Sequence, residues 1–238
     1  MRHTASRVMP PLMLFAAGFG RRMGTLTVHQ PKPLIAVAGR ALIDHALELC
    51  ADAGVGRVVV NLHYRGDQLA AHLQGRGVQF SWERDQLLET GGGLRAALPL
   101  LQGGPVLTLN SDVVWTGQNP LSQLVAAWNA DRMDALLLLL PMAQARGHMG
   151  KGDFAVAADG RISRGQGGED HIYIGAQLLR TEGLIDMPDG PFSLNRLWDR
   201  QIAAGRAFGI VHQGGWCDVG NPAGIAEAEA MLKDAHVS

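Results

Sequence analysis

A short apolar run near the start of the chain ends in a glycine-rich turn, Leu12-Met13-Leu14-Phe15-Ala16-Ala17-Gly18-Phe19-Gly20-Arg21-Arg22-Met23. The run Leu12–Ala16 predicts a strand that is buried on both faces. Small residues directly after such a strand let backbone N–H groups approach a phosphate, and a basic side chain adds positive charge. This stretch therefore predicts an α/β fold with a phosphate-binding turn at the end of its first strand.

The turn has three other possible interpretations. A Rossmann dinucleotide site needs a third glycine where Met23 stands, and an acidic residue after a second strand. The nearest acidic residue, Asp44, lies inside a segment that we expect to be helical. A Walker A loop needs Gly-Lys-Ser/Thr, which is absent. A plain strand-to-helix turn stays open on this segment alone.

Along the rest of the chain, short apolar runs alternate with amphipathic segments, which is typical of βαβ units. Strands are expected at Leu12–Ala16, Arg57–Asn61, Val78–Trp82, Val106–Leu109, Ala135–Leu140, His171–Ile174 and Phe208–His212. Helices are expected at Ala41–Ala53, Asp67–Leu73, Gly93–Leu101, Pro120–Ala130, Leu194–Ala204 and Ile225–Ala235. Asp159-Gly160 predicts a hairpin between Phe154–Ala157 and Ile162. The pattern predicts a single α/β domain over residues 1–238, with a central mixed, mostly parallel sheet flanked by helices.

Composition excludes several classes of protein. The 238 residues include 31 glycines, carry a net charge of −1 and are 47% hydrophobic, which argues against disorder and against nucleic acid or a membrane as partner. Two separated cysteines do not suggest a disulfide framework, and the chain is expected to be cytoplasmic. The apolar start resembles a signal peptide only superficially, because it leads directly into the glycine turn. Lysine is scarce, with only Lys32, Lys151 and Lys233.

The segment Pro31-Lys32-Pro33-Leu34 strengthens the phosphate interpretation. Its two prolines make a helix through it improbable, so we expect an extended loop that aims Lys32 at the phosphates. Together with the glycine turn and Leu26-Thr27, it resembles the sugar-1-phosphate nucleotidyltransferases (NDP-sugar pyrophosphorylases), with Gly24-Thr25 as a departure. The motif Arg22-Met23-Gly24 also resembles a motif of the molybdenum-cofactor cytidylyltransferases, but those enzymes lack the Pro-Lys-Pro element.

Two aspartates test this resemblance. Asn110 and Asp112 come at the carboxyl end of the strand Val106–Leu109, where open α/β sheets bind ligands. The resemblance implies that Asp112 and the Asp218 of Trp216-Cys217-Asp218-Val219-Gly220 are ligands of Mg²⁺, for which Mn²⁺ can substitute. The alternative to metal binding is that Asp112 caps a turn.

Glu89-Thr90-Gly91-Gly92-Gly93, expected just before a helix, most resembles the N-acetylmuramate-1-phosphate uridylyltransferases within that family. The resemblance implies a Rossmann-like domain, with a nucleotide-binding half at about residues 8–140 and a half for the sugar and second metal ligand at 141–238. It assigns catalysis to Arg22, Lys32 and Asp112. It assigns nucleotide binding to Ala16, Ala17, Gly18, Gly20, Arg22, Lys32, Glu89, Thr90, Gly91, Gly92 and Asn110. It assigns sugar binding to Lys151, Asp153, Glu169 and Gly175, and metal binding to Asp112 and Asp218.

The implied partners are a nucleoside triphosphate, with UTP favoured, and a sugar 1-phosphate, in a monomer or homodimer. Guanine with mannose, or a phosphorylated alcohol such as phosphocholine, stays open within the same chemistry. A non-catalytic nucleotide-binding module stays open in another class. Lys151 is equally well explained as a solvated loop lysine.

Overall fold

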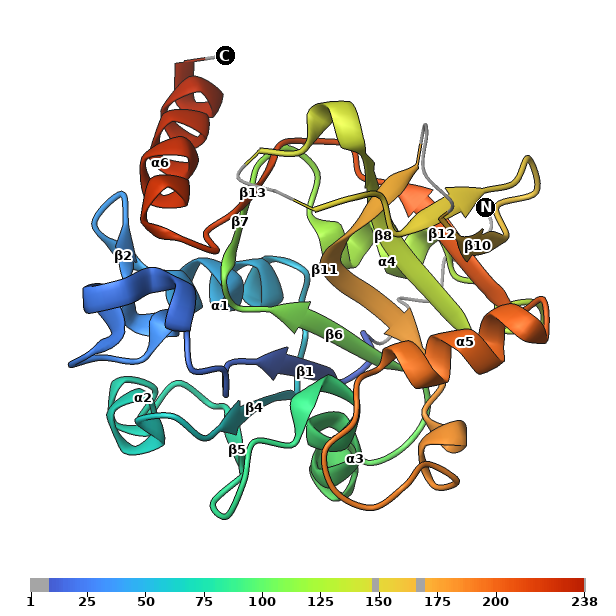
Figure 1. Cartoon of the computed structure of the whole chain (residues 1–238), viewed down its shortest axis with the longest axis horizontal. Helices are drawn as coiled ribbons and strands as arrows, with labels where there is room; N and C mark the ends of the chain where they lie inside the picture. The colour runs from blue at the N-terminus through green and yellow to red at the C-terminus, as the bar shows by residue number, and fades with distance from the viewer. Residues whose placement is uncertain (1–8, 147–149, 166–169, 238) are drawn as a thin grey trace, which may run out of the picture.

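The computed structural model describes residues 9–146, 150–165 and 170–237. Its centre is a nine-stranded sheet that takes strands from both halves of the chain (Figure 1). The main path runs β10 (Ile162–Arg164), β9 (Phe154–Val156), β11 (His171–Leu179), β6 (Val106–Asn110), β1 (Leu12–Phe15), β4 (Val58–Leu62) and β5 (Gln79–Trp82). Off this path, β8 (Ala135–Pro141) pairs with β11 and with β12 (Ala207–Val211).

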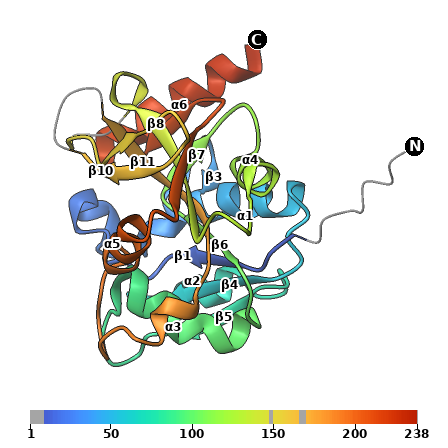
Figure 2. The ribbon, with the colours of Figure 1, turned by 90° about the vertical axis from the view of Figure 1, so that its right-hand side faces the viewer.

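The strands β6, β1, β4 and β5 are parallel to one another, whereas β11 runs antiparallel to β6 and β8. Helices cover both faces. Figure 2 shows α1 (Leu42–Asp52) and α4 (Pro120–Ala127) on one side of the sheet and α3 (Glu89–Leu101) and α5 (Asn195–Ala203) on the other. Residues of α2 (Gly66–His72) join the core on the α1 side. The prediction of a mixed sheet flanked by helices is confirmed.

Successive side chains of β1 point to opposite faces of the sheet, and both faces are covered, which explains why its sequence is apolar throughout. Leu12 and Leu14 face the core beneath α1 and α4, whereas Met13 faces the core beneath α3 and α5. All three side chains are fully buried. A strand covered on both faces needs apolar residues at every position, so the run 12–15 belongs at the centre of the sheet.

A third, smaller core lies beside the main sheet. Two short strands, β7 (Val113–Trp115) and β13 (Trp216–Asp218), pair antiparallel, and α6 (Pro222–Val237) packs beside them. The hairpin of β2 (Ala36–Val37) and β3 (Arg40–Ala41) contacts α6 as well. Figure 1 shows α6 at the edge of the molecule, next to this hairpin. Strands of two or three residues give too little alternation to be predicted from sequence.

Several predicted boundaries were wrong. α3 begins at Glu89, four residues before the expected Gly93, and β11 continues to Leu179 rather than ending at Ile174. The segment around Lys32 is a 3₁₀ turn, η2 (Lys32–Leu34), instead of an extended loop, and η1 (Arg21–Thr27) follows the glycine turn. Proline is tolerated in η2 because its missing N–H is not needed in a first turn.

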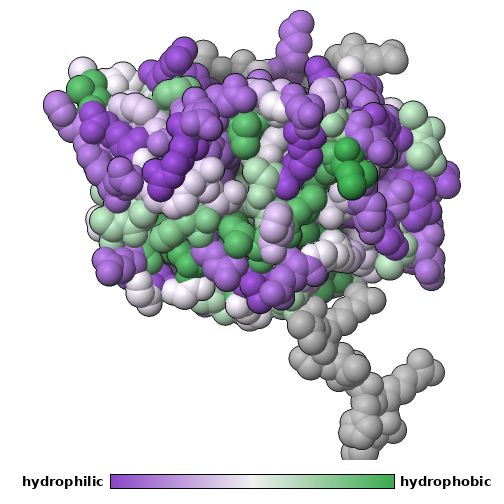
Figure 3. Space-filling view, turned by 90° about the horizontal axis from the view of Figure 1, so that it is seen from below, coloured by the Kyte–Doolittle hydropathy of each residue, from purple (hydrophilic) through white to green (hydrophobic). Residues whose placement is uncertain are grey.

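The remaining 3₁₀ turns are η3 (Met142–Gln144) and η4 (Glu182–Leu184). In the described ranges, no helix has the length and apolar content needed to cross a membrane. On the face seen in Figure 3, hydrophobic side chains form a broken band that hydrophilic side chains border on both sides.

Candidate active site

A cavity of about 240 Å³ opens at the carboxyl ends of β1, β4 and β6. This is the edge at which open α/β sheets bind their ligands. The cavity brings together eight of the residues that the sequence indicates, Ala16, Ala17, Gly18, Lys32, Glu89, Thr90, Asn110 and Asp112. It also includes Phe15, Pro33, Asn61, Leu87 and Ser111. Five separate segments of the chain therefore converge on one site.

Lys32 reaches across this cavity to Asp112. Its Nζ donates to Asp112 Oδ2 at 2.5 Å, and the two side chains are 10% and 31% exposed. Gly20, with φ +63°, passes so close that a Cβ there would lie 2.8 Å from Lys32 Cβ. Glycine is required at position 20 both for its left-handed backbone and for this contact. The turn and Lys32 are thus fixed against each other beside a carboxylate.

The ribbon of β7 and β13 places the second aspartate. Asp218 pairs with Val113, the residue after Asp112, and the N–H of Val219 donates to the carbonyl of Asp112 at 3.0 Å. The main chains that carry these two aspartates, 106 positions apart, are therefore joined by backbone hydrogen bonds. The relative position of the two aspartates is therefore set by the backbone pairing of β7 and β13.

Arg22 lies near Asp218. A Cβ on Gly220 would come within 2.7 Å of Asp218 Oδ2 and within 3.1 and 3.2 Å of the two terminal nitrogens of Arg22. The neighbouring Cys217 is not available as a thiolate ligand. Burial first, and then the charges of Glu227 and Asp218, raise the pKa of its thiol to about 11. Arg22 and Asp218 therefore lie together at this end of the ribbon.

Two residues that the sequence patterns did not indicate, Asn61 and Glu83, hold the glycine turn. Asn61 Oδ1 accepts from the N–H of Ala16 at 2.7 Å, and Asn61 Nδ2 donates to Glu83 Oε1 at 2.7 Å. The other oxygen of Glu83 accepts from the N–H of Leu88 at 2.7 Å, at the start of α3. Asn61 is 3% exposed and Glu83 is 2% exposed. Polar residues at or just after the carboxyl ends of the strands Arg57–Asn61 and Val78–Trp82 were the available signal.

Asn61→Ala is expected to destabilise the protein, because it leaves the buried Ala16 N–H and one oxygen of Glu83 without their partner. Each unsatisfied group costs about 1–3 kcal/mol, more for the carboxylate. Urea unfolding monitored by circular dichroism measures the loss. Asn119→Ala is not a suitable control, since Asn119 caps α4; Gln68→Ala, at an exposed position of α2, should leave the unfolding midpoint unchanged. A midpoint for Asn61→Ala equal to wild type would contradict the role of this network.

The glycines at the start of α3 have a packing role. The N–H groups of Gly91 and Gly92 donate to the carbonyl of Phe192, at 2.8 and 3.1 Å, and a Cβ on Gly91 would lie 2.4 Å from the Phe192 ring. The N–H of Leu194 donates to Thr90 Oγ1 at 3.0 Å. We call residues 187–194 the strap, since Figure 1 shows this orange segment running beside α3 before it enters α5. The strap holds the helix end that carries Glu89 and Thr90.

Lys151, Asp153 and Gly175, which the sequence indicates for the sugar, do not line this cavity. Asp153 Oδ2 accepts from the N–H of Tyr173 at 2.8 Å, so one of its oxygens is already used. Gly175 has φ +88° and contacts Asn110, since a Cβ there would lie 3.0 Å from Asn110 Cβ. Lys151 is exposed, and Glu169 falls outside the described residues. Of this group, Gly175 is therefore the residue that the structure brings next to the cavity.

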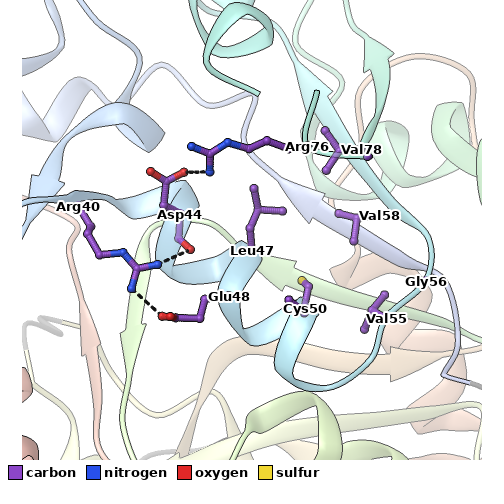
Figure 4. Close-up of a pocket in the computed structure, with 12 residues that line it drawn as sticks. Arg40, Asp44, Leu47, Glu48, Cys50, Val55, Gly56, Val58, Arg76 and Val78 are labelled. Atoms are coloured by element: carbon purple, nitrogen blue, oxygen red, sulfur yellow. Dashed lines mark hydrogen bonds and ion pairs between the residues drawn. The ribbon is translucent and has the colours of Figure 1, made fainter. Parts of the chain in front are cut away.

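A larger cavity, of about 520 Å³, lies at the amino ends of β4 and β5 against α1. Its charged groups pair with each other, Arg40 with Glu48 and Arg76 with Asp44 (Figure 4). Burial raises the pKa of the Cys50 thiol in its wall to about 12, which keeps the thiol protonated. With its ionic groups mutually paired and no reactive group, this cavity is a poorer candidate than the smaller one.

Comparison with known proteins agrees with the geometry. Residues 12–151 match the family described as the MobA-like NTP transferase domain. The chain is 42% identical, over 94% of its length and 97% of the relative, to an N-acetylmuramate alpha-1-phosphate uridylyltransferase of Caulobacter vibrioides. It is 32% identical to the protein of the same name in Neisseria meningitidis serogroup B, over 92% and 96% of the two chains. A UDP-glucose pyrophosphorylase solved with UDP-glucose shares the fold, with a TM-score of 0.76, 16% identity and coverage of 95% and 99%.

Proposed function

Since the chain belongs to the MobA-like NTP transferase family and is a nucleotidyltransferase, we propose that it transfers UMP from UTP to N-acetylmuramate 1-phosphate and releases pyrophosphate. The observation that carries this proposal is the cavity in which the phosphate turn, Lys32 and Asp112 meet. The two similar uridylyltransferases, each matched over nearly its whole length, support the choice of base and sugar.

The two aspartates fit a magnesium ion that arrives with the nucleotide. Mg²⁺ in such sites is held by one or two carboxylates and otherwise by substrate phosphates and water. In the described part of the chain, no group of three or more His, Cys, Asp or Glu side chains gathers as a metal cage. Asp112 and Asp218 would hold the ion, which neutralises charge on the phosphates and orients them. A site with two carboxylates and open space for phosphates agrees with that requirement.

The chain's own residues supply binding and alignment. Ala16, Ala17 and Gly18 line the cavity that would take the phosphates, and Asn61 holds this turn in position by accepting from the N–H of Ala16. A phosphate oxygen of the acceptor attacks the α-phosphorus, and the bond to the β-phosphate breaks so that pyrophosphate leaves. Lys32 and Arg22 stabilise the negative charge on the transferred and leaving groups. No covalent enzyme intermediate is required, so alignment and charge neutralisation supply the rate enhancement.

A pyrophosphate-release assay tests the proposal. The purified chain is incubated with Mg²⁺, each of UTP, CTP, GTP and dTTP, and a panel of sugar 1-phosphates that includes N-acetylmuramate 1-phosphate and mannose 1-phosphate. Turnover is expected to be fastest with UTP and N-acetylmuramate 1-phosphate, to stop when a chelator is added, and to return with excess Mg²⁺. Faster turnover with GTP and mannose 1-phosphate would show that these are the substrates instead. Turnover that persists in the presence of the chelator would contradict the proposed requirement for Mg²⁺.

A further inference from the structure

Glu89 has an unusual backbone conformation at the wall of the cavity. Its φ is +59°, in the left-handed region that residues other than glycine rarely adopt. It is the first residue of α3, and its exposed side chain lines the cavity beside Leu87 and Thr90. Backbone strain of this kind persists where the surrounding structure imposes it, and it concentrates at functional sites. A glycine would adopt the same backbone without strain, so the carboxylate at this position needs an explanation.

The charged groups that line the cavity indicate which part of a ligand Glu89 can face. Of the charged residues that line it, Lys32 and Asp112 pair with each other at 2.5 Å. Across the ranges that the structure describes, no hydrogen bond or ion pair engages the carboxylate of Glu89. An unpaired carboxylate repels a triphosphate. The phosphates therefore belong beside the turn and Lys32, and Glu89 faces the nucleoside end of the ligand.

The favourable effect of an acidic residue on the helix dipole does not account for Glu89. A carboxylate in the first turn stabilises a helix from any of several positions. Position 90 offers it without a left-handed backbone, because Thr90 has no positive φ. The side chain stands instead at a residue with a left-handed backbone, where it lines the cavity.

We propose that the Glu89 carboxylate determines base specificity by accepting a hydrogen bond from the imide N–H of the donor base. Uracil carries a hydrogen on N3, whereas cytosine presents a lone pair at N3, which a carboxylate repels. The carboxylate therefore favours UTP over CTP. This inference rests on the proposed function, since it assumes that a nucleoside triphosphate occupies the cavity.

Direct binding tests this role without the acceptor. Dissociation constants for UTP and CTP, each with Mg²⁺, are measured by isothermal titration calorimetry on wild type and Glu89→Gln. Wild type is expected to bind UTP more tightly. In Glu89→Gln the preference for UTP should fall about tenfold or more, because the charged acceptor is lost and the new amide can also donate to N3 of cytosine.

Two further variants separate the carboxylate from the backbone. Gln102→Gly is the matched control, since Gln102 has φ +61° at the opposite end of α3 and is exposed. It should leave both dissociation constants unchanged. Glu89→Gly removes the carboxylate and relieves the strain, so it should lose the UTP preference without lowering the melting temperature.

Each other outcome is decisive. An unchanged ratio in both Glu89 variants overturns the proposal. Equal weakening of UTP and CTP overturns it too, because it assigns the carboxylate to the ribose that both nucleotides share. Wild type that binds neither nucleotide defeats the proposed function and with it this inference, whereas a wild-type preference for UTP that survives in Glu89→Gln defeats this inference alone.

Discussion

Asp112→Asn is expected to lower the rate of pyrophosphate release by about 10³-fold or more while the protein stays folded. The substitution removes one of the two carboxylates that we propose as ligands for Mg²⁺, and the charge that faces Lys32 at 2.5 Å. The asparagine carbonyl can still accept from Lys32, and Asp112 is 31% exposed, so we expect a stability loss of only about 1–2 kcal/mol. Steady-state assays and thermal unfolding by circular dichroism measure the two effects.

Asp44→Asn provides the matched control. Asp44 also pairs with basic side chains, His72 and Arg76, but it does so in the cavity at the amino ends of the strands. Its loss should leave the rate unchanged. Wild-type activity in a folded Asp112→Asn protein would remove Asp112 from the metal site, and a comparable loss of activity in Asp44→Asn would show that the assay reports ion pairing in general.

Gly91→Ala is expected to lower the free energy of unfolding by about 2 kcal/mol. Its Cβ would lie 2.4 and 2.5 Å from two carbons of the Phe192 ring and 2.9 Å from the Phe192 carbonyl oxygen. Overpacking of this kind costs about 1–3 kcal/mol or more, and it outweighs the gain of about 1 kcal/mol that alanine brings to a helix. For a chain of this length, each kcal/mol lowers the melting temperature by about 2–4 °C.

A double-mutant cycle checks the cause. Phe192→Leu should itself destabilise the core, but the pair Gly91→Ala with Phe192→Leu should lose less than the sum of the two single changes. Gly56→Ala is the control, because nothing lies within 4 Å of a Cβ there and its backbone suits other residues. That variant should be as stable as wild type or slightly more so. Strict additivity of Gly91→Ala and Phe192→Leu would mean that the strap does not constrain position 91.

The sequence was sufficient for the parts of the site that are built locally. The strand that ends at Phe15, the turn with Gly18 and the loop around Lys32 each carry a readable pattern over a few residues, and the structure brings them to one cavity. The order of strands, by contrast, depends on pairings between distant segments. The antiparallel β11, which inserts between β6 and β8, has a bulge at Gly175 that divides it, and only its first part could be predicted.

The unpredicted contacts share one physical origin. The family resemblance assigns Gly91 and Gly92 to nucleotide binding, but their N–H groups donate to the carbonyl of Phe192, about 100 residues later in the chain. A Cβ on Gly93 would lie 2.7 Å from a buried oxygen of Glu83. Tight packing between distant segments leaves no periodic trace in the sequence. A glycine run has the same composition whether it faces a ligand or another part of the chain.

The ribbon of β7 and β13 has a consequence for how the protein matures during synthesis. The segment that matches the transferase family ends at residue 151, yet Asp218 reaches Asp112 only when β13 pairs with β7. A ribosome must therefore release almost the whole chain before both carboxylates can meet. Contacts between residues so far apart in sequence form late, because the intervening chain must first be ordered. A product terminated before residue 216 would retain Gly18, Lys32 and Asp112 but would lack Asp218, so it is expected to lack the activity that we propose for the whole chain.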